Sequence, residues 1–174
     1  MHCQPFALSV HFTSTLSSYS WTLVNIYRPC FGDLREDFVS WFYDLDIPDE
    51  EDWLIVGDFN FIRSPDKRNK PRGHCADMQT YNDIIRAQIL TELPIKGRSF
   101  TWSKMQSDPL LEQLDWFITS LHWTTSYLAT MVNPLGNSTT DHTPYVIYIQ
   151  TNIPGCKLFR FENCPFWFLS SCGN

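Results

Sequence analysis

Hydrophobic positions in the first third of the chain follow the spacing of β-strands. Residues 6–12 and 20–28 are rich in β-branched and aromatic types, and Pro29 ends the second stretch. Residues 53–56 are apolar on both faces, which is typical of a central strand covered on both sides. Four further strands are predicted in the second half of the chain, over residues 99–103, 114–119, 129–132 and 145–150.

Two other stretches have the spacing of helices that bury one face. The first is preceded by Asp33 and Glu36, which form a capping-box pattern. Its apolar positions are Leu34, Phe38, Trp41, Phe42 and Leu45. The second is predicted to begin at Asp77 as its cap, and its apolar positions are Met78, Tyr81, Ile85 and Ile89.

Two helices inserted among many strands predict an α+β sandwich whose helices cover its outer faces. The polar motifs described below fall where strands end, which predicts a site on loops at one edge of the sheets. No period is recognisable after residue 152. We therefore expect one domain over residues 1–152 and a C-terminal tail over residues 153–174.

Composition narrows the class of protein. A chain of 174 residues with 43% hydrophobic and 18% charged residues is expected to be globular, with one core. The six cysteines have no metal-binding spacing. The N-terminus lacks the pattern of a signal peptide, and no apolar run reaches the length of a membrane span. These features predict an intracellular protein.

The charge of the chain is uneven. A formal net charge of −6 argues against a protein that coats nucleic acid non-specifically, although an enzyme needs only a local basic rim. Residues 63–72 form such a basic run, which includes Arg63, Lys67 and Arg68. These cations could contact DNA phosphates, or the run could be a solvated loop.

Asp58 and Asn60 are the first candidates for chemistry. They lie two residues apart directly after the buried strand, so a rigid support could aim both side chains at one substrate oxygen. The alternative is an Asx turn that closes the strand, because Asp and Asn readily bond their own backbone.

Asp115, Asp141 and His142 are the other candidates. Asp141 and His142 could supply a metal ligand and a group that titrates near neutrality, or could belong to a plain surface turn. Asp115 lies in an apolar strand, where a carboxylate is unfavourable unless it is bonded. It could orient a histidine, or face water from an edge strand.

The order of these motifs resembles the endonuclease/exonuclease/phosphatase superfamily. The resemblance spans residues 21–150, and residues 53–60, 99–103 and 159–163 are similar to the endonuclease region of plant LINE-type (non-LTR) retrotransposon polyproteins. In chain order, the motifs that carry it are Asn25-x-Tyr27-x-Pro29, Gly57-Asp58-Phe59-Asn60, Leu114-Asp115-Trp116-Phe117 and Asp141-His142.

This resemblance implies a four-layer αββα sandwich and a Mg²⁺-dependent phosphodiesterase that nicks DNA, with the nucleus as a compatible compartment and no obligate oligomer. In such enzymes the metal screens the phosphate charge and stabilises the leaving oxygen. By the same resemblance, Asp58 would position or deprotonate the attacking water. Asn60 and Tyr27 would hydrogen-bond the phosphate.

The remaining roles follow in the same way. His142 would contact a non-bridging phosphate oxygen or act as an acid–base group, and Asp115 would orient it through its ring N–H. Asp141 would lie near the metal, directly or through water.

The chain also departs from the family pattern. Thr140 replaces the usual serine, and Cys30 follows Pro29 where some relatives have a polar group. The family places an Asn motif and a metal-binding Glu motif upstream of Asn25, and neither is found among the 24 preceding residues. Glu36 is the first glutamate, and it lies on the predicted helix.

We therefore expect a sandwich without its N-terminal strands and an inactive or impaired nuclease-like domain, since Mg²⁺ requires near-octahedral oxygen ligation. Two alternatives remain open: a non-catalytic nucleic-acid-binding remnant, and a phosphatase that acts on another phosphoester.

Overall fold

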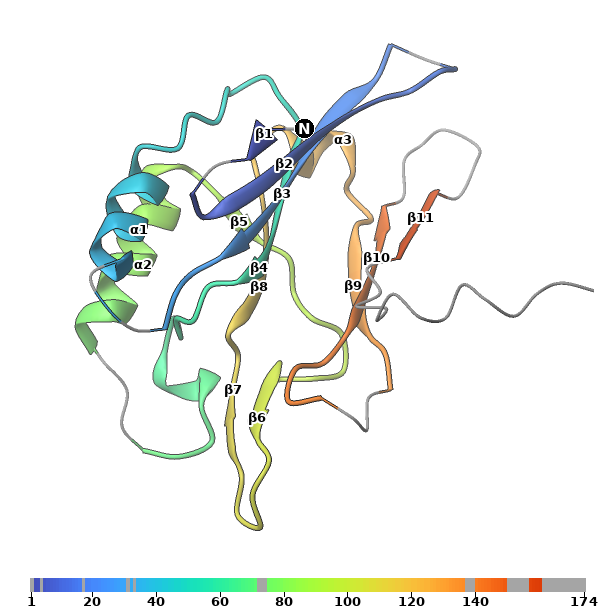
Figure 1. Ribbon diagram of the computed structural model, residues 1–174. Helices are drawn as coiled ribbons and strands as arrows, with labels where there is room; N and C mark the ends of the chain where they lie inside the picture. Colours follow the sequence, from blue (N-terminus) through green and yellow to red (C-terminus); the bar gives the residue numbers. More distant parts are fainter. Residues whose placement is uncertain are drawn as a thin grey trace, which may run out of the picture.

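A computed structural model describes residues 2–3, 5–16, 18–30, 32, 34–71, 75–136, 140–149 and 157–160, with the backbone alone for 2–3 and 157–160. Its largest element is a six-stranded sheet with the order β1-β2-β3-β4-β8-β5 (Figure 1). These strands are β1 (His2–Cys3), β2 (Ala7–Thr13), β3 (Ser20–Tyr27), β4 (Trp53–Asp58), β5 (Thr91–Glu92) and β8 (Asp115–Thr119).

Strands β3 and β4 are parallel, and the other pairs of this sheet are antiparallel. The parallel pair is joined through helix α1 (Leu34–Tyr43), which lies on one face of the sheet beside helix α2 (Cys75–Ala87) (Figure 1). A crossover helix of this kind is what a parallel connection requires.

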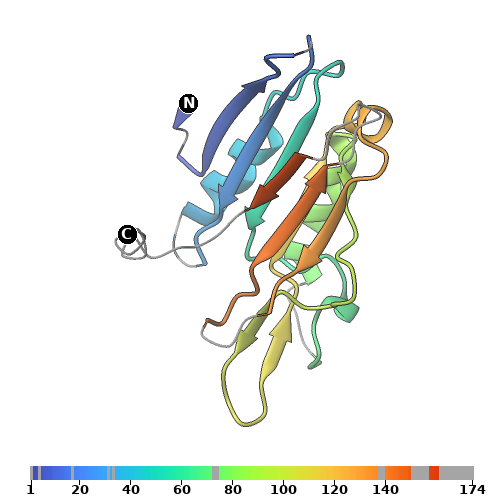
Figure 2. The same cartoon turned by 90° about the vertical axis from the view of Figure 1, so that its right-hand side faces the viewer.

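The opposite face of the large sheet is covered by a second sheet with the order β11-β10-β9 (Figures 1 and 2). Its strands are β9 (Met131–Pro134), β10 (Tyr145–Ile149) and β11 (Lys157–Arg160). A hairpin of β6 (Trp102–Lys104) and β7 (Leu110–Glu112) projects beyond the sheets (Figure 2). Two short helical turns, η1 (Pro65–Lys67) and α3 (Trp123–Ser126), complete the described elements.

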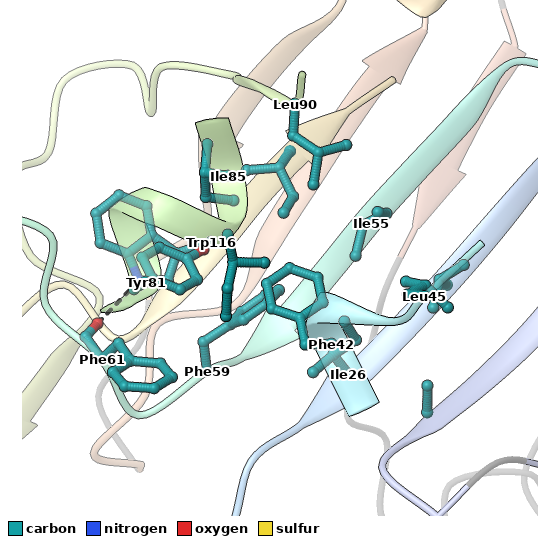
Figure 3. Packing of buried hydrophobic residues seen from close by; sticks show 14 of the residues in the cluster. Ile26, Phe42, Leu45, Ile55, Phe59, Phe61, Tyr81, Ile85, Leu90 and Trp116 are labelled. Atoms are coloured by element: carbon teal, nitrogen blue, oxygen red, sulfur yellow. Dashed lines mark hydrogen bonds between the residues drawn. The ribbon is translucent and has the colours of Figure 1, made fainter. Parts of the chain in front are cut away.

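Alternation along β4 divides the core into two layers. Ile55 faces the helices and packs with Phe42, Phe59, Tyr81 and Trp116 (Figure 3). Leu54 and Val56 face the second sheet and pack with Phe117, Val132, Tyr145 and Ile147. A strand buried on both faces is therefore confirmed at this position.

The described residues thus form three layers, in the order helix, sheet, sheet. No helix covers the outer face of the second sheet within the described part of the chain (Figure 2). The arrangement fits the predicted αββα sandwich with some of its elements lacking. No helix in the described ranges is long and apolar enough to cross a membrane.

The predicted helices form, but α2 begins at Cys75, so Asp77 lies within its first turn and is not its cap. In addition, one predicted apolar position of each helix is exposed. Leu34 is 53% exposed because it begins α1, and Ile89 is 58% exposed because α2 ends at Ala87. Ile84 is buried on α2 instead. Asp33, and with it the predicted capping box, lies outside the described residues.

The strand predictions are correct in type but shifted in places. β6 begins three residues later than predicted, and β9 begins two residues later. The short strands β1, β5 and β7 were not predicted. Strand β11 lies within the predicted tail and pairs with β10.

Candidate active site

Three of the predicted site residues lie side by side across the large sheet. In the register of the strands, Tyr27 of β3 is paired with Asp58 of β4, and Asp58 is paired with Asp115 of β8. This row forms because β3 and β4 both end at this edge and the antiparallel β8 begins there. The predicted site at one edge of the sheet is therefore formed by strand register.

Asp58 is held by the turn that follows it. Its Oδ1 accepts the backbone N–H of Asn60 at 3.0 Å, and its Oδ2 accepts the side-chain Nδ2 of Asn60 at 3.1 Å. The first bond is that of an Asx turn, so this turn and the candidate site are the same structure. Asn60 has a φ of 47°, a left-handed conformation that Asn tolerates better than most residues.

His142 lies between the two carboxylates of the row. Its Nδ1 is 2.9 Å from Oδ2 of Asp115, and its Nε2 is 3.8 Å from Oδ2 of Asp58. A hydrogen bond at Nδ1 fixes the orientation of the ring and leaves Nε2 facing Asp58. The structure thus brings together Asp58, Asn60, Asp115 and His142, which are separated by up to 84 positions in the chain.

The electrostatics of this cluster favour proton transfer near neutrality. Burial, reinforced by the charge of Asp115, raises the pKa of Asp58 to about 6, against the opposing effects of Asn60 and His142. The hydrogen bond to Asp115 is the main cause of a raised pKa for His142. A carboxyl group with a pKa of about 6 beside an imidazole whose pKa is raised can exchange protons with a bound substrate.

Asp141 lies beside this cluster on an exposed segment. Its carboxylate accepts the indole N–H of Trp102 at 3.0 Å, and its carbonyl accepts the backbone N–H of Ser103 at 2.8 Å. A pocket of about 220 Å³ opens here, and Arg98, Phe100, Trp102 and Asp141 are among the residues that line it. Asp141 and Thr143, which both line this pocket, flank His142 in the sequence.

The donors around Asp141 do not fit a Mg²⁺ ion. Among the residues that the structure describes, no three His, Cys, Asp or Glu side chains are grouped so as to hold a metal. The carboxylate of Asp141 is already engaged by Trp102. Since Mg²⁺ requires near-octahedral oxygen ligation, the described side chains supply no complete site for it.

The basic run has carboxylate partners. Arg63 is paired with Glu92 at 2.5 Å, and Lys67 lies 4.0 Å from the same carboxylate. Arg68 is paired with Glu112 at 2.6 Å. These ion pairs join the loop to β5 and β7. The paired cations are therefore less available to DNA phosphates than the cations of a solvated loop would be.

Two residues that support the cluster were not singled out from the sequence. The buried Arg28 donates from Nη1 to the carbonyl of Asn60 at 2.9 Å. The hydroxyl of Thr101 accepts the backbone N–H groups of Leu114 and Asp115, both at 2.9 Å. Arg28 lies within the Asn-x-Tyr-x-Pro segment, but nothing in the local pattern indicates that its side chain is buried.

Comparisons with known proteins place this fold. No family model and no curated protein sequence matches the chain. The endonuclease domain of TRAS1, a telomere-specific non-LTR retrotransposon, has a similar structure, with a TM-score of 0.66 and 13% identity over 85% of this chain. This chain spans 65% of that domain.

Two other solved structures are similar. The 3′ phosphatase NExo from Neisseria, bound to product DNA hairpin, has a TM-score of 0.55 and 15% identity over 75% of this chain and 61% of its own. Beta toxin from Staphylococcus aureus has a TM-score of 0.51 and 14% identity over 76% of this chain and 54% of its own. The chain therefore has the endonuclease/exonuclease/phosphatase fold, and the predicted fold class is confirmed.

Proposed function

We propose that this chain carries the acid–base part of a site that hydrolyses phosphodiesters, with DNA as the substrate. The observation that carries the proposal is the arrangement of His142 between Asp115 and Asp58, with its Nδ1 bonded to one carboxylate and its Nε2 facing the other. The proposal is supported by the similarity in fold to a solved domain described as an endonuclease and to a phosphatase bound to DNA.

Asp58 is the group that accepts a proton from the attacking water. With a pKa of about 6, its carboxyl group is largely ionised at neutral pH, yet it is basic enough to take up a proton. The raised pKa of His142 favours its protonated form, which donates from Nε2 to a non-bridging oxygen of the phosphate. Asp115 keeps the ring in the orientation that this donation requires.

Asn60 and Tyr27 have different parts in this proposal. The Nδ2 of Asn60 donates to Oδ2 of Asp58 at 3.1 Å and to the carbonyl of Arg28 at 2.7 Å, so both of its N–H groups are used. Asn60 therefore acts as a positioning residue for Asp58. Tyr27 is 60% exposed beside Asp58, and its hydroxyl is the available donor to the phosphate.

We further propose that the chain on its own is impaired. Phosphoryl transfer depends on positive charge that stabilises the leaving oxygen, and Mg²⁺ supplies that charge in enzymes of this kind. The donors near Asp141 do not complete such a site. His142 alone gives incomplete compensation, so hydrolysis is expected to be slow.

Nicking of supercoiled plasmid tests both parts of the proposal. The chain is incubated with plasmid and Mg²⁺, beside Asp58→Asn and His142→Ala, with Asp49→Asn in the exposed acidic loop as the control. We expect slow nicking that falls about 100-fold or more in the two site variants, the scale of a lost acid–base group. The control variant should keep the rate of the unmodified chain.

Two results would count against the proposal. Nicking that survives in both site variants would refute the role of Asp58 and His142. Turnover at the rate of an ordinary nuclease, roughly 1 per second or faster, would refute the impairment alone. A 3′-phosphorylated oligonucleotide in a parallel reaction separates a phosphatase from an endonuclease, because only a phosphatase releases inorganic phosphate from it.

A further inference from the structure

Arg28 occupies a position next to the catalytic turn that no motif explains. It follows the last residue of β3, and Tyr27 of that strand is paired with Asp58. The backbone N–H of Arg28 donates to the carbonyl of Asp58 at 2.9 Å, which extends the strand pairing by one residue. The side chain of Arg28 therefore begins beside the turn that carries Asn60.

Arg28 and Asn60 hold each other through reciprocal bonds. Nη1 of Arg28 donates to the carbonyl of Asn60 at 2.9 Å, and Nδ2 of Asn60 donates to the carbonyl of Arg28 at 2.7 Å. Asn60 in turn donates to both carboxylate oxygens of Asp58. The three residues form one chain of hydrogen bonds that ends at the carboxylate facing His142.

The guanidinium of Arg28 is buried and has few partners. Arg28 is 2% exposed, and its guanidinium carbon lies 3.7 Å from the centre of the Phe61 ring. Its Nε is buried without a hydrogen-bond partner among the described residues. A buried charge is unfavourable unless it is hydrogen-bonded or paired, and the side-chain hydrogen bond of this guanidinium goes to the turn. The group that it orders is the carbonyl of Asn60.

The conformation of the turn explains why such a contact is needed. Asn60 has a φ of 47°, which is uncommon for a residue other than glycine. A planar guanidinium can stack on Phe61 and donate to the carbonyl of Asn60 at the same time, whereas a lysine ammonium has no planar group to stack on the ring. Burial lowers the pKa of Arg28 to about 10, so the group stays charged at neutral pH.

We propose that Arg28 is a positioning residue of this site, whose guanidinium, held between Phe61 and the carbonyl of Asn60, keeps the turn in the conformation that presents Asp58 to His142. The catalytic meaning of this role rests on the proposed function. The role itself is a matter of hydrogen bonding and can be measured without turnover.

The test is hydrogen exchange of the Asn60 amides followed by NMR in Arg28→Met, with Arg35→Met as the matched control. Arg35→Met also removes a guanidinium near the site, but that guanidinium is paired with Asp77 of α2. In Arg28→Met the Asn60 amides should exchange about tenfold faster, the scale of one lost charge-assisted hydrogen bond, while the amides of β4 keep their rates. Arg35→Met should leave Asn60 unchanged.

Arg28→Lys decides the matter if Arg28→Met does not fold. It keeps the charge but not the planar donor, so Asn60 should still exchange faster while the global stability falls less. Unchanged exchange of Asn60 in either folded variant, or equal acceleration throughout β4, would overturn the proposal. Nicking is measured separately, so the hydrogen-exchange result can still be interpreted if the proposed function is wrong.

Discussion

At the scale of single residues, Asp58 should make the stability of the fold depend on pH. Burial raises the pKa of its carboxyl from 3.8 to about 6, so the folded state holds a proton that the unfolded state has lost between these values. Stability from this group is therefore present at low pH and is lost as pH rises through that interval. The difference between these two pKa values corresponds to about 3 kcal/mol in the free energy of unfolding.

Asp58→Asn removes this dependence. As pH rises from 4 to 7, the variant should become more stable relative to the unmodified chain, by up to about 3 kcal/mol. The loss of one hydrogen bond to Asn60 reduces this gain. Urea unfolding at the two pH values measures the change. An equal difference in stability at both values would contradict the burial of this carboxyl group.

His142 gives the complementary prediction. Its pKa is raised, first by the hydrogen bond to Asp115, so Asp115→Asn should lower it. A raised pKa for a base stabilises the fold below its unfolded value of 6.5, and this contribution is lost as pH rises through the folded value. Asp115→Asn should therefore lower the free energy of unfolding more at acidic pH than at alkaline pH.

An NMR titration of the His142 ring measures this pKa directly. His122 is the internal control, because its Nδ1 is bonded to Asp52 at 2.9 Å and not to the site. A pKa of His142 that is unchanged in Asp115→Asn would show that the two side chains are not bonded in solution.

At the scale of elements, Gly57 decides whether β4 can approach β3. Its φ is 141°, and a Cβ at this position would overlap the backbone carbonyl of Ile26. Gly57→Ala should therefore destabilise the fold by about 3 kcal/mol or more. Gly97→Ala is the matched control: its φ is 71°, but no atom lies within 4 Å of the added Cβ, so its loss should be about 1 kcal/mol.

Urea unfolding of both variants makes the comparison. A loss in Gly57→Ala no larger than that in Gly97→Ala would mean that β3 and β4 separate easily at this edge. Since Tyr27 and Asp58 are paired there, such a result would also weaken the proposed site.

Periodicity predicted the long elements because their burial is local. The alternation of β3 and the apolar run of β4 fix two faces before any partner is known, and both strands were predicted. The end of α2 was missed because Ile89 continues the helical spacing, although its φ of 52° places it outside the helix. Short strands such as β5 exist only through their partner, β8, and carry no period of their own.

The candidate site was predictable in its members but not in its supports. Asp58 and His142 were found from motifs, and strand register then brought them together. Arg28 and the pairing of Arg63 with Glu92 join positions about 30 residues apart, so no local pattern indicates them. The role of a charged residue in this chain depends on which partner the fold brings to it.

At the scale of the whole molecule, charge limits the binding of DNA. The net charge is −6, and Arg63 and Arg68 of the basic run are paired with Glu92 and Glu112. A non-catalytic nucleic-acid-binding remnant would need free cations, because phosphate contacts supply most of non-specific affinity. We therefore expect weak retention of DNA by the unmodified chain, with little dependence on salt.

Neutralising the two partner carboxylates should reverse this behaviour. The double variant Glu92→Gln with Glu112→Gln changes the net charge from −6 to −4 and releases Arg63, Lys67 and Arg68. Each cation that newly contacts a phosphate steepens the dependence of log K on log salt by about 0.9, so the slope should steepen by about two to three. Gel retardation between about 50 and 200 mM salt covers the range in which this effect is large.

Asp49→Gln with Asp46→Gln, in the exposed acidic loop, gives the same net charge without releasing these cations and should leave the slope unchanged. If the unmodified chain already retains DNA with a steep slope, the ion pairs do not hold these cations from DNA, and the binding remnant becomes the better description of the protein.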